Sequence, residues 1–166
     1  MTARSDETKQ LRPGLWDTIN ERYPGSMITK IDFVPLARLS KPLSRTRLSF
    51  VSSAGIQPKG TIPFDVVHPV GDFSFRRVPS ASSIRDLEIH QIKYPTTGAI
   101  RDLNVIFPIE RLQELANEGV VGELTPNFFS FIGYQMDPER FEHTLAEDIA
   151  DAVVADGAEA ALLCPA

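Results

Sequence analysis

The sequence has few of the residues that build disulfides and metal sites. Among its 166 residues there is one cysteine, Cys164, so an internal disulfide and a zinc site built on several thiolates are both excluded. The three histidines, His68, His90 and His143, do not follow the spacing of a common metal-ligand motif. We therefore expect no metal site in this chain.

An excess of positive charge and long apolar runs are also missing. The chain has 17 Lys and Arg residues against 22 Asp and Glu residues, a net charge of −5, whereas non-specific nucleic-acid binding needs a basic surface. No apolar run approaches the roughly 20 residues of a membrane-spanning helix. The polar residues 1–10 contain no apolar core of a secretory signal. We expect a cytoplasmic protein with no nucleic-acid or membrane partner.

Residues 1–45 have the composition of an N-terminal arm and connection. They begin with polar residues, and after residue 24 they are rich in Pro, Ser and basic residues, with one short helix expected around Trp16. Residues 46–166 are expected to form the folded domain. The apolar and β-branched run 47–51 predicts its first core strand.

Residues 55–100 predict an irregular insertion in this domain. They contain several Pro and Gly residues and only short apolar runs, of which 64–67 and 73–76 predict short strands. A long, weakly structured stretch inside a compact domain is typical of a functional segment. We therefore expect the insertion to carry part of a functional site.

The last third predicts a β-α-β unit. A helix is expected over residues 108–119, a buried strand over 128–133, a long helix over 137–157 and a second buried strand over 160–164. Neither strand alternates apolar with polar residues, which is typical of parallel strands covered on both faces. The sequence therefore predicts an α/β fold with a mostly parallel sheet and a C-terminal β-α-β unit.

Cys164 falls at the carboxyl end of the last predicted strand. In open α/β sheets, ligands bind beyond this end of the strands. Pro165 then interrupts the strand, and the helix that normally follows a parallel strand is not present. Two interpretations remain open: Cys164 is part of a site that is unfinished in this chain, or it is a small buried residue of an edge strand.

Several short segments resemble the glycine/sarcosine/betaine reductase selenoprotein B family, which is related to the D-proline reductase selenoprotein. Residues 71–76, Gly-Asp-Phe-Ser-Phe-Arg, are similar to its G-D-x-S-x-R segment, and residues 102–108 are similar to its D-x-N-x-x-F-P segment. His90 falls where the family has a histidine, and residues 130–133 resemble its S-x-x-G strand. The resemblance runs from about residue 46 to the end of the chain.

The resemblance implies a reductase that cleaves a C–N bond of an amino acid or related amine with a selenol or thiol. It implies a selenocysteine or cysteine at the position after Ala166, so we expect the reading frame to have ended at a UGA codon that encodes selenocysteine. The implied partners are a dithiol or thioredoxin-like reductant and other subunits of a reductase complex, one of which carries a pyruvoyl group. The chain alone is expected to be inactive.

The implied chemistry needs a carboxylate clamp, a proton source and a thiol. Arg76 and Arg77 are candidates for the clamp, with a salt bridge to Asp72 as the alternative. His90 is the candidate proton carrier, with a hydrogen-bonded structural histidine as the alternative. Cys164 is the candidate resolving thiol.

Asp72, Asp102 and Asn104 are further candidates for substrate binding. Capping or turn roles are the alternative for Asp102 and Asn104. For the chain as a whole, two other functions remain open. One is a non-catalytic domain that binds a small anion or regulates a partner, and the other is a thiol oxidoreductase that uses Cys164 with a partner's cysteine.

Overall fold

The structure is a computed structural model that describes Glu21 and residues 37–166. The helix predicted around Trp16 lies outside the described residues. Residues 37–166 lie in one compact unit, whose first described element is a short 3-10 helix, η1 (Leu43–Arg45). In the described ranges, no helix combines the length and the apolar composition that a bilayer crossing needs.

A five-stranded sheet organises this unit. Its central strand β1 (Arg47–Ser52) pairs in parallel with β7 (Ala160–Cys164) on one side. On the other side β1 pairs in parallel with β5 (Glu123–Leu124) and then with β6 (Asn127–Phe131), and β3 (Phe75–Pro79) runs antiparallel to β6. The predicted α/β fold with a mostly parallel sheet is confirmed.

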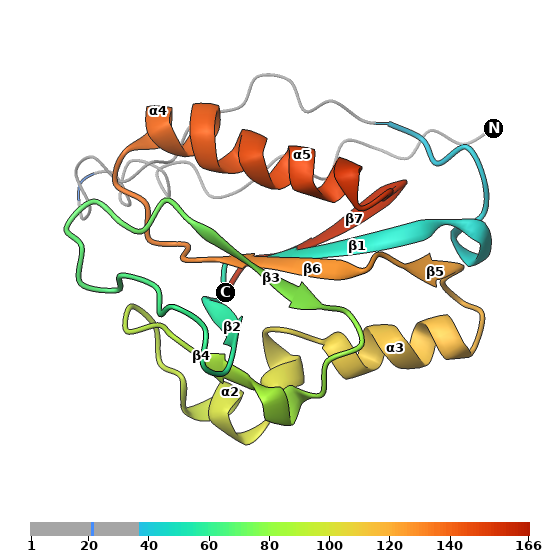
Figure 1. The fold of residues 1–166 in the computed structure, drawn as a ribbon, viewed down its shortest axis with the longest axis horizontal. Helices are drawn as coiled ribbons and strands as arrows, with labels where there is room; N and C mark the ends of the chain where they lie inside the picture. The colour runs from blue at the N-terminus through green and yellow to red at the C-terminus, as the bar shows by residue number, and fades with distance from the viewer. Residues whose placement is uncertain (1–20, 22–36) are drawn as a thin grey trace. The chain divides into compact units, whose positions relative to one another are not determined.

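One face of the sheet carries an aromatic core. The rings of Phe50, Phe107 and Phe128 are fully buried and meet edge to face, with ring centroids 5.1 Å apart for Phe50 and Phe107 and 5.6 Å apart for Phe50 and Phe128. A short 3-10 helix, η3 (Leu103–Val105), leads into α3 (Ile109–Asn117), which covers this face (Figure 1). The helix predicted over 108–119 is confirmed.

The opposite face lies under one long helical segment. It consists of α4 (Pro138–Arg140), a π-helical stretch η4 (Phe141–Ala146) and α5 (Glu147–Ala155). The predicted cap is present, because the Asp137 side chain accepts a hydrogen bond from the backbone N–H of Arg140 at 3.0 Å. The helix and strands predicted for the C-terminal β-α-β unit are confirmed, with β1 lying between β6 and β7.

The insertion is more ordered than the sequence predicted. It contains a two-stranded antiparallel sheet of β2 (Ile56–Pro58) and β4 (Leu87–Ile89), a 3-10 helix η2 (Ile84–Asp86) and a short helix α2 (Thr97–Arg101). These elements lie on the same side of the main sheet as α3 (Figure 1).

The two strands predicted at 64–67 and 73–76 were misplaced. No strand forms at 64–67, because the Asp65 carboxylate accepts hydrogen bonds from the backbone N–H groups of Val67 and His68 and turns the chain. The second strand begins later than predicted, at Phe75, and continues as β3.

The prediction that the last strand is covered on both faces was wrong. In the described part of the chain, β7 pairs with β1 alone, and Leu162 and Leu163 are 42% and 70% exposed. An apolar composition predicted burial, but the strand lies at an edge of the sheet.

The aromatic core gives a direct test of the fold. Phe107→Ala is expected to lower the free energy of unfolding by about 3–5 kcal/mol, because the cavity lies between two other buried rings. The control Val105→Ala removes a side chain that is 66% exposed and should change stability by less than about 0.5 kcal/mol. Urea denaturation measures both values, and equal effects would contradict this description of the core.

Candidate functional site

Four residues from four strands form a row across the sheet near the carboxyl end of β1. Arg76 pairs with Ser130, Ser130 pairs with Ser52, and Ser52 pairs with Cys164. Side chains at paired positions point to the same face, and each step between strands is about 4.8 Å. The candidates Arg76 and Cys164 therefore lie on one face of the sheet, three strands apart.

The segment 52–55, which we call the serine turn, fastens the ends of the parallel strands together. The backbone N–H of Ser53 donates to the carbonyl of Cys164 at 3.3 Å, and its carbonyl accepts from Gly133 N–H at 3.1 Å. The hydroxyl of Ser53 accepts from the backbone N–H of Ala166 at 3.0 Å. The end of β7 and the residues after β6 are thus held by one residue.

The backbone of His90 passes against the same turn. Its N–H donates to the carbonyl of Gly55 at 2.8 Å, and Gly55 adopts a φ of +67°. A Cβ atom at Gly55 would lie 2.8 Å from the carbonyl oxygen of His90, so this close approach requires glycine. The Nδ1 atom of His90 is buried and has no hydrogen-bond partner among the described residues.

Tyr94 is a residue at this site that the sequence did not indicate. Its hydroxyl donates to the carbonyl of Ala54, in the serine turn, at 2.8 Å, and burial raises the pKa of this phenol. No motif marks Tyr94, because its partner lies 40 residues away in the sequence. The serine turn therefore contacts two segments that are distant in the sequence, one that carries His90 and Tyr94 and one that ends in Cys164.

Cys164 itself is half-buried at the end of β7. Its Sγ atom lies 3.7 Å from the carbonyl oxygen of Pro165, and its side chain packs at the margin of the aromatic core. Within the described ranges, no group of three His, Cys, Asp or Glu side chains is arranged to hold a metal ion.

The G-D-x-S-x-R segment forms a chain of contacts between its own residues. The carboxylate of Asp72 accepts hydrogen bonds from the backbone N–H and the hydroxyl of Ser74. The Ser74 hydroxyl in turn accepts from Arg76 at 2.8 Å, and the Arg76 guanidinium lies 4.0 Å over the ring of Phe64. Among the described residues Asp72 makes no salt bridge with Arg76, because the Ser74 hydroxyl lies between them.

The glycine of this segment allows two loops to meet. Gly71 has a φ of +103°, and a Cβ atom at this position would collide with the carbonyl oxygen of Tyr134. Next to it, the amide of the buried Gln135 donates to the carbonyls of Asp72 and Ile132 at 2.8 and 2.7 Å. The segment thereby fastens the insertion to the end of β6.

Arg77 lies on the other face of the sheet. Its guanidinium is 3.4 Å from the Asp156 carboxylate and lies over the ring of Phe129, on the side covered by α5. The structure therefore does not bring Arg77 together with Cys164.

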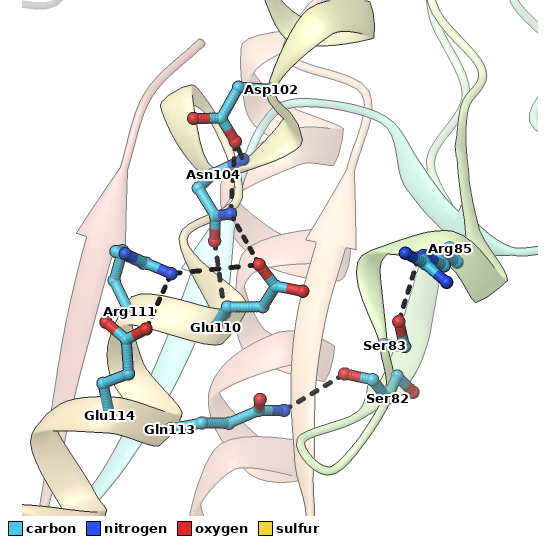
Figure 2. Close-up of polar contacts among 9 residues, drawn as sticks. All are labelled: Ser82, Ser83, Arg85, Asp102, Asn104, Glu110, Arg111, Gln113 and Glu114. Carbon is cyan, nitrogen blue, oxygen red and sulfur yellow. Dashed lines mark hydrogen bonds and ion pairs between the residues drawn. The ribbon is translucent and has the colours of Figure 1, made fainter.

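Asp102 and Asn104 are engaged at the start of α3 (Figure 2). The Asp102 carboxylate accepts from the backbone N–H of Asn104 at 3.0 Å, and the Asn104 amide contacts both the carboxylate and the backbone N–H of Glu110. These contacts correspond to the capping and turn roles that the sequence left open. The segment that carries Asp102 and Asn104 also reaches the serine turn, where the Ser52 hydroxyl donates to the carbonyl of Ile106 at 3.1 Å.

The raised pKa of Tyr94 predicts a change in stability at alkaline pH. The folded state holds this proton more tightly than the unfolded chain, so the stabilisation is present below about pH 10 and is lost as the pH rises through the folded pKa. Tyr94→Phe should reduce the alkaline loss of stability in urea denaturation between about pH 8 and pH 11. Tyr134→Phe, which removes an exposed hydrogen bond to Pro69, controls for the loss of a hydroxyl. An unchanged alkaline decline in Tyr94→Phe would contradict the prediction.

Comparison with known proteins gives several relatives of this chain. D-proline reductase subunit gamma of Acetoanaerobium sticklandii is 30% identical over 125 residues, which are 75% of this chain and 50% of the relative. Glycine reductase complex component B subunit gamma of Peptoclostridium acidaminophilum is 27% identical over 144 residues, 85% of this chain and 32% of the relative. Sarcosine reductase complex component B subunit beta of the same organism is 28% identical over 133 residues, 74% of this chain and 30% of the relative.

The chain thus spans half of the first relative and about a third of the other two. No solved structure matches it significantly. The model of the glycine/sarcosine/betaine reductase selenoprotein B family matches residues 20–166, which is most of the sequence. The chain therefore belongs to this family.

Proposed function

We propose that this chain forms part of a selenol- or thiol-dependent reductase that cleaves a C–N bond of an amino acid or related amine. The relatives are named for the reduction of D-proline, glycine and sarcosine, three compounds that carry a carboxylate close to a C–N bond. The observation that carries the proposal is the serine turn, which holds the ends of β6 and β7 and the Cys164 backbone at the carboxyl end of the sheet.

The proposed redox residue is a selenocysteine or cysteine that follows Ala166. It would supply the nucleophile that attacks the carbon of the C–N bond. The residues present fit this position, because Ser53 holds the backbone N–H of Ala166 at 3.0 Å and so orients the polypeptide at the strand end. Cys164 lies three residues before the proposed redox residue, where its thiol is suited to resolve a bond to the redox atom.

The leaving amine needs a proton, and two residues of this chain lie at the turn that holds the strand ends. Tyr94 carries a phenol proton at neutral pH, as any tyrosine does, and burial raises its pKa further above the ordinary value of about 10. His90 contributes an imidazole whose Nδ1 atom has no partner in the described part of the chain. We propose that these two side chains supply and recover the proton.

The remaining requirements of the reaction come from other proteins. The relatives are subunits or components of reductase complexes, so partner subunits are expected for this chain as well. We propose a dithiol or thioredoxin-like protein as the source of two electrons, with the pyruvoyl group, where the reaction uses one, on a different subunit.

The coding sequence tests the position of the redox residue. We expect the codon after Ala166 to be UGA and the downstream frame to encode a helix and further cysteines. Genomic sequencing past this codon decides the matter. A different stop codon, or a downstream frame without these features, would remove the proposed residue.

Activity measurements test the role of Cys164. The complete protein, assayed with a dithiol and the amino-acid substrates, should lose reductive cleavage on Cys164→Ser while its circular dichroism spectrum stays unchanged. Leu163→Ser introduces the same hydroxyl at the exposed neighbouring position and should keep the activity. Full activity of Cys164→Ser, or robust cleavage by the 166-residue chain alone, would overturn the proposal.

A further inference from the structure

A concave pocket of about 360 Å³ lies between β4 and α2, within the insertion. Pockets that hold small molecules in proteins begin at about this size, near 300 Å³. Its floor is apolar and buried, formed by the side chains of Leu87, Ala99 and Leu103. The pocket therefore offers an apolar surface to a small ligand.

Two cationic side chains line this pocket. Arg85 comes from η2 and Arg101 from the end of α2. Among the described residues, neither guanidinium takes part in a hydrogen bond or an ion pair, whereas those of Arg47 and Arg77 are paired with carboxylates. The pocket therefore presents two guanidinium groups that the described residues leave without a direct partner.

An acidic side chain lines the same pocket and is fixed in place. The Glu88 carboxylate accepts a hydrogen bond from the amide of Gln57 at 2.9 Å, and Gln57 is fully buried. The pocket therefore combines charges of both signs with an apolar floor. An α-amino acid carries three complementary groups: a carboxylate for the cationic side chains, an ammonium group for the acidic one, and a side chain for the apolar floor.

The pocket adjoins the serine turn. Gln91 lines it, and the Cβ atom of Gln91 lies 3.4 Å from the position that a Cβ at Gly55 would take. The preceding residue, His90, donates its backbone N–H to the carbonyl of Gly55. A ligand in the pocket would therefore lie beside the segment that also carries His90 and Tyr94.

We propose that this pocket binds an α-amino acid with an aliphatic side chain. Arg85 and Arg101 bind the carboxylate, Glu88 binds the ammonium group, and the side chain packs on the apolar floor. The identity of this amino acid as a substrate rests on the proposed function. The inference assigns the carboxylate clamp to residues other than Arg76 and Arg77.

Nitrogen-15 NMR titration of the full 166-residue chain tests the pocket with three probes that share the same branched 3-methylbutyl group. Leucine carries both charges, 4-methylpentanoate lacks the ammonium group, and 3-methylbutylamine lacks the carboxylate. Leucine should shift the amide signals of residues 84–91 and 99–103, and each analogue should bind about tenfold more weakly or worse, because each loses a charged hydrogen bond.

Arg85→Gln and Arg101→Gln should each weaken leucine binding by about tenfold or more. The control Arg38→Gln removes an exposed guanidinium elsewhere and should leave the affinity unchanged. Thermal unfolding confirms that the variants fold. Binding of the three probes with equal affinity, absence of binding up to the solubility of leucine, or shifts centred on Gly60–Ile62 and Arg76 would each overturn the inference.

This experiment also separates the pocket from the reductase function. Binding to the 166-residue chain requires no redox residue. Leucine binding in the pocket, together with no reductive cleavage by the complete protein, would refute the proposed function and leave the pocket standing. Cleavage by the complete protein without binding here would refute the pocket alone.

Discussion

The hydrogen bonds of Ser53 are the constraint on which the rest of the site depends. One residue uses its N–H, its carbonyl and its hydroxyl to hold Cys164, Gly133 and Ala166. These partners belong to segments that are distant in the sequence, and backbone pairing of β1 with β6 and β7 brings their strand ends to the same edge. Because buried backbone groups need partners, a change in the turn would affect every segment that it holds.

Elements with strong local signals could be predicted from the sequence. The helix that begins at Asp137 has its cap, its proline and its apolar stripe within a few residues, and the structure places it as expected. The strands β2 and β4 are three residues long, and their pairing partners lie about 30 residues apart. Their stability comes from this distant pairing, so the sequence around each strand contained too little information to predict them.

In the candidate site too, contacts between neighbours in the sequence could be predicted and contacts between distant residues could not. The G-D-x-S-x-R segment is recognisable because Asp72, Ser74 and Arg76 contact one another at a spacing of two residues. Tyr94 was missed because its partner, Ala54, is distant in the sequence and offers only a backbone carbonyl. The exposure of β7 was missed for a related reason, since an apolar run predicts a strand but does not reveal whether a neighbour covers it.

The hydrogen-bond and ion-pair partners of each arginine order the candidates for the carboxylate clamp. An anion that binds Arg77 would compete with the carboxylate of Asp156, whereas an anion at Arg76 would compete with the Ser74 hydroxyl and with backbone carbonyls. Each lost hydrogen bond to a charged group costs about 1.5–3 kcal/mol. Arg85 and Arg101 have no such bonds in the described part of the chain, so an anion there would replace none of the hydrogen bonds of the described residues. The geometry therefore favours a clamp in the insertion, beside the serine turn, over one on β3.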